Sequence, residues 1–298
     1  MKFNAACLQL TSNDQPKENL DQVIKLSDQA VKDGAQIILT PENTFLLTLD
    51  EGILKEKSED YEKGFCINEI IKYAKSNSIW FLIGGTPVKE NNNIFNRSVL
   101  ISPNGEIVTT YDKIHMFDVN LPNGESYEES KKFKAGKNLS VTKYDKIHMF
   151  DVNLPNGESY EESKKFKAGE SLSVTKLPWG NLGLSICYDL RFPNHYRQLM
   201  KQGADFLAVP SAFTKNTGER HWHILLRSRA IENFCYVLAP AQTGKHFNNR
   251  ETYGHSMIVS PDGIILSEKK EDIGLIISEI DIEKVKKIRS EIPSVSFD

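Results

Sequence analysis

The chain has 298 residues, 39% of them hydrophobic, and a net charge of −3, a composition typical of a folded globular protein. This charge gives no electrostatic reason to expect binding to nucleic acid or to an anionic membrane, and no apolar stretch is long enough for a membrane helix. Strand-like sequence follows Met1 directly, so no signal peptide is predicted. Four widely separated cysteines (Cys7, Cys66, Cys187 and Cys235) fit a reducing cytoplasm and argue against a disulfide framework or a zinc site.

Strands and helices alternate along the first part of the chain. An apolar strand over residues 3–10 precedes a helix over residues 17–32, whose apolar side chains recur with helical spacing. The elements expected next are a buried strand over residues 35–40, a helix over residues 61–76 and a strand over residues 80–84. This alternation is typical of α/β proteins.

Three hairpins and further strand–helix units are expected in the rest of the chain. Gly-containing turns connect residues 98–102 with 106–111, residues 172–175 with 182–187, and residues 256–260 with 264–267. The other predicted elements are strands over residues 204–210, 235–240 and 274–281, a helix over residues 219–233 and a closing helix. Because βα units are mixed with hairpins, we predict a layered α/β fold with mixed sheets. No linker-like segment interrupts it, so a single domain over residues 1–298 is expected.

One 33-residue sequence occurs twice in succession, as residues 111–143 and 144–176. The copies differ at two positions only, where Lys137 and Asn138 of the first correspond to Glu170 and Ser171 of the second. Two copies are too few for a solenoid, and most of the repeated sequence is polar. We therefore predict a tandem duplication within a surface excursion, where added loop length costs little free energy.

A cysteine lies where a predicted buried strand meets a polar turn. The apolar run ends at Cys187, Asp189 and Arg191 follow, and Pro193 suits the first turn of a helix. A position just ahead of a helix N-terminus lowers the pKa of a thiol and supplies N–H groups for an oxyanion. A cysteine in an apolar strand is nevertheless more often a small core residue, so a catalytic role needs support from other residues.

Two more polar side chains stand at predicted strand ends. Glu42 follows the strand over residues 35–40, and the lysine of Tyr-Asp-Lys-Ile-His occurs twice, as Lys113 and Lys146. Strand ends of α/β sheets gather at one edge, where sites form. A partly buried carboxylate can deprotonate a thiol, and a lysine can stabilise an oxyanion. Taken alone, Glu42 is equally well explained as a loop residue, and the lysine is equally well explained as a solvated surface residue. Together with Cys187, however, the two residues predict a nucleophilic site.

This set of residues resembles the nitrilase superfamily of carbon–nitrogen hydrolases over almost the whole chain. The resemblance is carried by Leu39-Thr40-Pro41-Glu42, the repeated Tyr-Asp-Lys-Ile-His-Met-Phe-Asp-Val, residues 183–193 and residues 209–213. It implies a four-layer αββα sandwich with mixed sheets, a homodimer or higher homo-oligomer, and no cofactor. It also implies a catalytic triad of Glu42, one of the two lysines and Cys187, with an auxiliary glutamate that is Glu129 or Glu162.

Within the superfamily, residues 217–223, 227–233, 241–246 and 253–256 look most like the deaminated glutathione amidases. The resemblance implies hydrolysis of a small carboxylate-bearing amide to an acid and ammonia. An ω-amidase acting on α-ketoglutaramate-type amides is the close alternative. Two other classes stay open: a protein whose activity the duplication has impaired, and a redox-sensing thiol protein, which needs a resolving cysteine that does not lie near Cys187 in the sequence.

The implied mechanism is covalent acyl transfer. Glu42 takes the proton of Cys187, the sulfur attacks the amide carbon, and the lysine together with the Tyr188 N–H holds the oxyanion. Ammonia leaves and water hydrolyses the thioester. Arg191 and Lys245 are candidates for binding a substrate carboxylate, although internal salt bridges explain such residues equally well. No metal is expected, because the histidines show no spacing typical of ligands.

The continuity of the two hairpins favours one lysine over the other. Lys113 directly extends the strand over residues 106–111, and residues 172–175 directly precede the turn that leads to the Cys187 strand. Both hairpins persist only if the surplus residues bulge out between them, which places Lys146 in the bulge. We therefore predict that Lys113 is the working lysine, while the choice of glutamate stays open.

Overall fold

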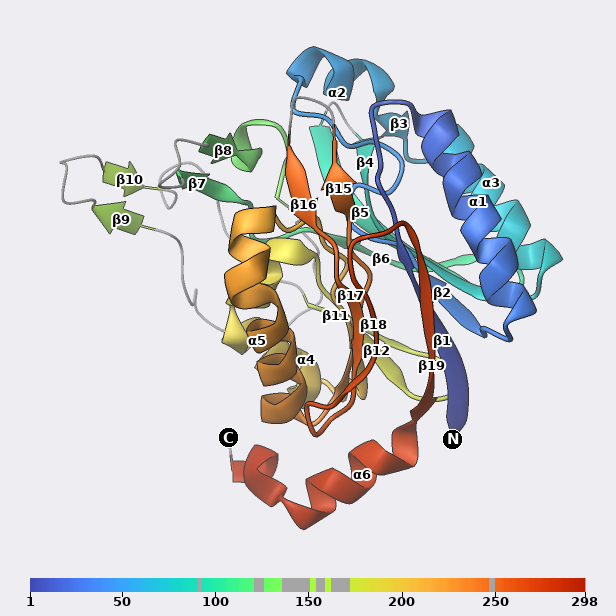
Figure 1. The fold of residues 1–298 in the computed structure, drawn as a ribbon, viewed down its shortest axis with the longest axis vertical. Coiled ribbons are helices and arrows are strands. Elements are labelled where there is room, and N and C mark those ends of the chain that lie inside the picture. Colours follow the sequence, from blue (N-terminus) through green and yellow to red (C-terminus); the bar gives the residue numbers. More distant parts are fainter. Residues whose placement is uncertain are drawn as a thin grey trace.

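Two β-sheets lie face to face and helices cover both outer sides (Figure 1). The computed structural model describes residues 1–90, 93–120, 126–135, 151–153, 159–161, 172–246 and 250–297. The expected four-layer αββα sandwich is thereby confirmed. No helix within these ranges has both the length and the apolar character needed to cross a membrane.

The first sheet combines a parallel centre with antiparallel edges. Its order is β19-β1-β2-β4-β5-β6, with β3 paired to β4. The contacts β1·β2 and β2·β4 are parallel, whereas β19, β5 and β6 join antiparallel. The strands are β1 (Lys2–Gln9), β2 (Ile37–Leu39), β3 (Glu59–Asp60), β4 (Trp80–Glu90), β5 (Asn93–Ile101), β6 (Ile107–Asp112) and β19 (Gly274–Asp281).

The second sheet is also mixed, with the order β11-β12-β13-β14-β17-β18. β12, β13 and β14 run parallel, and hairpin partners flank them on either side. Its strands are β11 (Ser173–Lys176), β12 (Asn181–Leu184), β13 (Phe206–Ala208), β14 (Tyr236–Ala239), β17 (Ser256–Val259) and β18 (Ile265–Lys269).

Each outer layer contains two helices. Helices α1 (Pro16–Lys32) and α3 (Phe65–Ser76) cover the first sheet, and α4 (Pro193–Lys201) and α5 (Lys215–Asn233) cover the second (Figure 1). Two more helices, α2 (Glu51–Lys57) and α6 (Ile282–Glu291), lie outside these layers.

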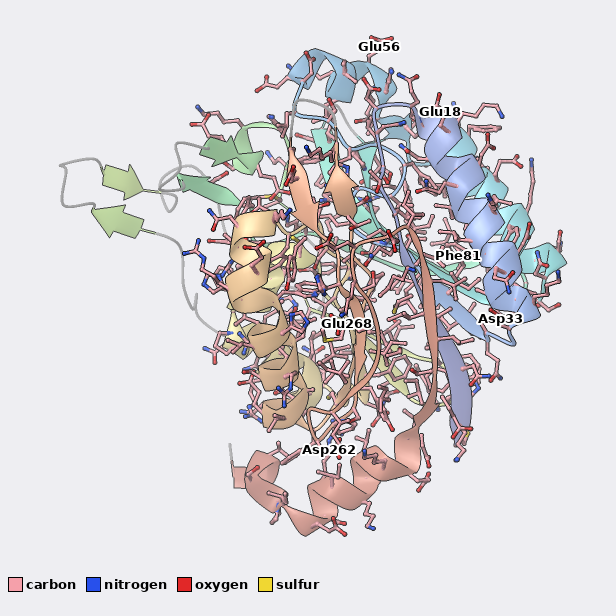
Figure 2. All side chains as sticks on the ribbon, in the orientation of Figure 1. Glu18, Asp33, Glu56, Phe81, Asp262 and Glu268 are labelled. Carbon is pink, nitrogen blue, oxygen red and sulfur yellow. The ribbon has the colours of Figure 1, made fainter. Side chains whose placement is uncertain are left out.

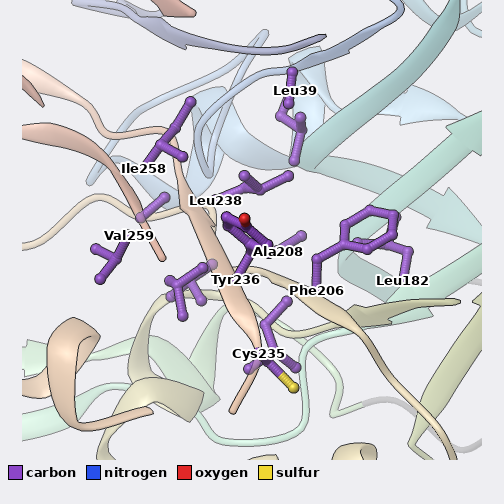
Figure 3. Packing of buried hydrophobic residues seen from close by; sticks show 14 of the residues in the cluster. Leu39, Leu182, Phe206, Ala208, Cys235, Tyr236, Leu238, Ile258 and Val259 are labelled. Atoms are coloured by element: carbon purple, nitrogen blue, oxygen red, sulfur yellow. The ribbon is translucent and has the colours of Figure 1, made fainter. Parts of the chain in front are cut away.

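Alternating side chains of β1 show how the layers are formed. Ala5 and Cys7 point into the core between the sheets, whereas Ala6 and Leu8 belong to the cluster under α1 and α3. Figure 3 shows the inter-sheet core, where Leu39 of the first sheet faces side chains of the second sheet. Charged side chains extend outward from the ribbon in Figure 2. Burial on both faces explains the continuous apolar sequence of the central strands.

The two copies of the repeat form hairpins with the same register. β7 (Asp118–Asn120) pairs with β8 (Ser126–Glu128), and β9 (Asp151–Asn153) pairs with β10 (Ser159–Glu161). The second hairpin lies well away from the sandwich, at the far left of Figure 1. The end of β6, the last strand of the first sheet, belongs to the first copy of the repeat. In the second sheet, β11 belongs to the end of the second copy. Both expected hairpins therefore persist; the single-domain organisation stays a prediction.

Several boundaries differ from the expected ones. The strand before Cys187 ends at Leu184, because the Asp189 carboxylate accepts the Ile186 N–H at 2.8 Å and turns the backbone. Helix α2 was not predicted; it is short, and the Asp50 side chain caps it by accepting the Ile53 N–H at 2.9 Å. A helix of about two turns with few apolar positions carries too weak a period to be recognised.

Candidate active site

Cys187 begins a 3₁₀ helix, η3 (Cys187–Arg191), between the end of β12 and α4. Its backbone is left-handed, with φ of 49°, and its N–H donates to the Pro210 carbonyl at 2.9 Å. Pro193 occupies the first turn of α4 as predicted. A left-handed non-glycine residue is uncommon and persists only where its surroundings hold it. The backbone thus presents this side chain in a fixed direction.

The Glu42 side chain is almost completely buried and fully hydrogen-bonded. Its Oε1 accepts the Lys113 ammonium at 2.7 Å and the Asn96 amide at 3.0 Å. Its Oε2 accepts the Ala212 N–H at 3.0 Å. These donors come from both sheets and orient the carboxylate, which raises the pKa of the nearby Cys187 thiol.

Lys113 directly follows β6 and is only 2% exposed. Its Nζ lies 2.7 Å from Glu42 Oε1 and 2.7 Å from both carboxylate oxygens of Glu129. Burial alone lowers the pKa of Lys113, but the two carboxylates outweigh it and raise the pKa above its ordinary value. The ammonium therefore stays charged. Lys146 and Glu162, the other candidates, lie outside the described residues.

Glu129 belongs to a 3₁₀ helix, η1 (Glu129–Lys131), that follows β8. Besides the lysine, it accepts the Phe117 N–H at 2.6 Å. Burial raises the pKa of Glu129, and the nearby Glu42 carboxylate adds to this against the opposing effect of Lys113. The Glu129 carboxyl group consequently binds a proton more readily than an ordinary glutamate does.

The pKa of Cys187 differs from the sequence-based expectation. Burial is the largest influence and raises the pKa well above its ordinary value, and the Glu42 carboxylate raises it further. Lys113 and the backbone at Ala212 oppose this shift but do not overcome it. The expectation of a lowered pKa is therefore wrong, because burial and Glu42 together outweigh Lys113 and the backbone at Ala212. The resting group is a neutral thiol that needs a base.

A pocket of about 910 Å³, part of it open to solvent, leads down to these residues. Its floor contains Glu42, Lys113, Glu129 and Cys187. The other lining residues include apolar, polar and basic side chains: Asn43, Leu46, Thr48, Leu49, Leu54, Phe117, Glu128, Lys132, Phe133, Tyr188, Arg191, Ala212, Phe213, Thr214, Thr217 and Arg250. The pocket suits a small polar molecule with an apolar part.

Of the residues expected to bind substrate, Tyr188 and Arg191 line this pocket and Lys245 does not. The Lys245 side chain is 77% exposed and its Nζ lies 3.4 Å from Glu251 Oε1. These two residues face each other in the hairpin of β15 (Thr243–Lys245) and β16 (Glu251–Tyr253). Lys245 therefore lies at the surface, paired with Glu251 and outside the pocket. The expectation that Lys245 binds a substrate carboxylate is wrong.

Two supporting residues were not recognised from the sequence. Asn96 holds Glu42, and Lys132 lines the pocket while donating to the Leu49 carbonyl at 2.7 Å. The run Asn96-Arg97-Ser98 interrupts an otherwise apolar strand with three buried polar side chains, a signal that could have identified Asn96. Lys132 sits in polar loop sequence and had no such signal.

Asp189 connects the Cys187 turn to the Lys113 segment. Its completely buried carboxylate accepts the Tyr111 hydroxyl at 2.6 Å, the Ile186 N–H at 2.8 Å and the His115 N–H at 3.2 Å, and pairs with the His115 ring. Burial alone raises the pKa of Asp189, but nearby imidazoles and Tyr111 hold it well below the usual range. This one ionised carboxylate thus holds both the Cys187 turn and the Lys113 segment in place.

A buried carboxylate, ammonium and thiol meet at the strand ends of an αββα sandwich, an arrangement that is chemically suited to acyl transfer. The sequence model of the carbon–nitrogen hydrolase family matches residues 4–143 and 133–290, so the chain belongs to this family. The expected family is confirmed, and with it a carbon–nitrogen hydrolase of the amidase type.

Individual relatives cover nearly the whole chain. The deaminated glutathione amidase of Synechocystis sp. is 40% identical over 301 residues, covering 98% of this chain and 97% of that protein. The enzyme of the same name from Yersinia enterocolitica is 35% identical over 294 residues, covering 97% and 91%.

Solved structures show the same fold. The C. elegans NitFhit protein superposes with a TM-score of 0.79 at 30% identity, over 100% of this chain and 65% of that chain. Saccharomyces cerevisiae Nit3, a nitrilase superfamily member, gives a TM-score of 0.79 at 24% identity, over 98% and 94%, and supports the fold alone.

Proposed function

We propose that this amidase hydrolyses a small carboxylate-bearing amide of the deaminated glutathione type through a thioester on Cys187. The supporting observation is the buried contact of Lys113 with both Glu42 and Glu129 beside the thiol. Glu42 acts as the base, Lys113 stabilises the oxyanion, and Glu129 positions the ammonium. The names of the relatives that cover nearly the whole chain support this substrate class.

The reaction begins with a proton transfer. Glu42 accepts the proton of the neutral Cys187 thiol as the sulfur attacks the amide carbon. Charge then develops on the amide oxygen, where the Lys113 ammonium and the Tyr188 N–H stabilise it. Protonated Glu42 returns the proton to the leaving nitrogen, the C–N bond breaks and a thioester remains. Glu42 next deprotonates a water molecule, whose attack releases the acid and regenerates the thiol.

Basic side chains support an anionic substrate. Arg191 lies along the pocket, and its guanidinium stands over the rings of Tyr188 and Phe213, at 5.8 and 5.2 Å from their centroids. Its Nη1 lies 3.3 Å from His221 Nδ1. Burial and the nearby arginines lower the pKa of His221, which favours the neutral ring, whose Nδ1 can accept a hydrogen bond from the guanidinium. Arg191 is therefore suited to bind a substrate carboxylate.

We further propose a cytoplasmic homo-oligomer. Four free, buried cysteines support a reducing compartment. Helix α5 exposes Ile224 by 66% and Ile231 by 44%, and the neighbouring hairpin exposes Ile264 and Leu266. Exposed apolar side chains grouped on adjacent elements are suited to a subunit contact.

Product analysis with two substrates tests the proposed reaction. We expect deaminated glutathione to be hydrolysed with a higher kcat/KM than α-ketoglutaramate; the reverse order would identify an ω-amidase. Cys187→Ala and Cys187→Ser should abolish hydrolysis by either route while leaving the melting temperature nearly unchanged, because the side chains are similar in size. Mass spectrometry of the wild type should show an acyl adduct on Cys187. Lack of hydrolysis of both amides would refute the proposal and indicate an impaired protein.

A further inference from the structure

Three side chains from separate elements meet on the outer side of the second sheet. They are His223 of α5, His255 of the turn between β16 and β17, and Glu268 of β18. Glu268 Oε1 lies 2.9 Å from His223 Nε2 and 2.5 Å from His255 Nδ1. All three donor atoms lie within 4.8 Å of one another. Glu268 is labelled near the centre of Figure 2.

The surrounding residues fix the directions of both imidazoles. The Tyr253 ring stacks on His255 with centroids 4.2 Å apart and meets His223 edge-on at 6.0 Å. The His255 backbone is left-handed, with φ of 57°, and its carbonyl accepts the Trp222 indole N–H at 2.8 Å. A non-glycine residue held in this uncommon conformation at a side-chain cluster is an observation that points to function.

We propose that His223, His255 and Glu268 form a binding site for a divalent transition metal ion of the zinc class. Two imidazole nitrogens and one carboxylate oxygen are ligands that such ions favour, and a water molecule completes the coordination. In binding, each neutral imidazole carries its proton on the ring nitrogen that does not face the metal. The side chains are 32%, 14% and 23% exposed, so an ion can reach them from solvent.

A second cluster of potential ligands among the described residues lacks these properties. His115, Asp189 and His195 also lie close together, but Asp189 is completely buried. Its carboxylate is occupied by the hydrogen bonds that tie the Cys187 turn to the Lys113 segment. A metal ion there would have to displace these donors, so this cluster is structural.

A metal ion at the proposed site would join helix α5 to β18. The first turn of α5 leads into the substrate pocket, which Thr214 and Thr217 line. The ion itself would lie outside that pocket, since none of its three ligands is a lining residue. We therefore expect the ion to stabilise the fold without taking part in hydrolysis, and the inference is independent of the proposed substrate.

Metal titration of the full-length chain tests the inference. Cys187→Ala serves as the background, so that the active-site thiol does not compete for the ion. After treatment with a chelator, calorimetry with Zn²⁺ should show one equivalent bound, and Co²⁺ should give a visible absorption band of a nitrogen- and oxygen-ligated ion. His223→Gln and Glu268→Gln should each weaken binding at least about tenfold. The melting temperature should rise with Zn²⁺ in the background protein and not in these variants.

His221→Gln is the matched control, because it removes an imidazole from the same helix without touching the cluster. It should leave Zn²⁺ binding unchanged. His255→Asn is a third ligand variant, since asparagine tolerates the left-handed backbone, and it should also lose binding. Circular dichroism verifies that each variant is folded. Absence of saturable binding, binding retained in folded His223→Gln or His255→Asn, or equal loss in the control would overturn the inference.

Discussion

Replacing Asp189 by asparagine tests whether one carboxylate holds the active site together. Each of its oxygens accepts two donors: Oδ2 takes the Tyr111 hydroxyl and the Ile186 N–H, and Oδ1 takes the His115 N–H and ring nitrogen. An asparagine amide must turn its NH₂ toward one of these pairs. Tyr111 or the His115 ring can switch to accepting, but a backbone N–H cannot.

In either orientation one buried backbone N–H therefore loses its acceptor. An orphaned donor costs about 1–3 kcal/mol, and the lost charge assistance adds to this, so we expect Asp189→Asn to destabilise the protein by about 2–4 kcal/mol. Tyr111→Phe is the graded control: it removes one donor, leaves no orphan and should cost about 1 kcal/mol. Urea unfolding measures both changes. Because Ile186 adjoins Cys187, kcat should fall in Asp189→Asn as well.

The pH dependence provides a second measurement. The folded-state pKa of Asp189 lies below its unfolded value, so its ionisation stabilises the fold above the ordinary aspartate pKa of about 3.9. The stability difference between wild type and Asp189→Asn should be constant above about pH 5 and shrink as the pH falls below 4. If Asp189→Asn were as stable and as active as Tyr111→Phe, the reasoning would be refuted.

Three further changes test other parts of the structure. Lys113→Ala should abolish amide hydrolysis and Lys146→Ala should not; the opposite pattern in a steady-state assay would contradict the hairpin argument. Arg191→Gln should raise KM about tenfold or more for the free acid and leave KM for its methyl ester unchanged, as expected for loss of a charged hydrogen bond; equal effects on both would exclude carboxylate binding. Gly84→Ala should destabilise the protein by about 3 kcal/mol or more in denaturant unfolding, since overpacking has this cost. The added Cβ would lie 1.8 Å from the Thr40 carbonyl oxygen.

Features that depend on local sequence were predictable. Pro193 marks the start of α4, and the position of Cys187 ahead of that helix follows from the same few residues. The placement of Lys113 beyond β6 follows from a short turn that fixes the register, where Ser98 pairs with Tyr111. These features can be predicted from neighbouring residues, without knowing how the two sheets pack.

Features that depend on distant parts of the chain were not predictable. The pKa of Cys187 depends on burial and on Glu42, which is contributed by the other sheet. The contact of Asn96 with Glu42 joins residues far apart in the sequence, and the exposure of Lys245 depends on its pairing with Glu251. In each case the property belongs to the packed structure and not to a segment.

The neutral state of Cys187 determines which molecules can react with it. Peroxide and simple alkylating agents attack thiolates, so a buried thiol with a raised pKa is a poor target for them. In the proposed mechanism, a molecule that fits the pocket brings its carbonyl to the sulfur while Glu42 removes the proton, so binding and activation coincide. Burial thus protects Cys187 from peroxide and simple alkylating agents. We expect the same cysteine to react selectively with electrophiles that have the shape of its substrate.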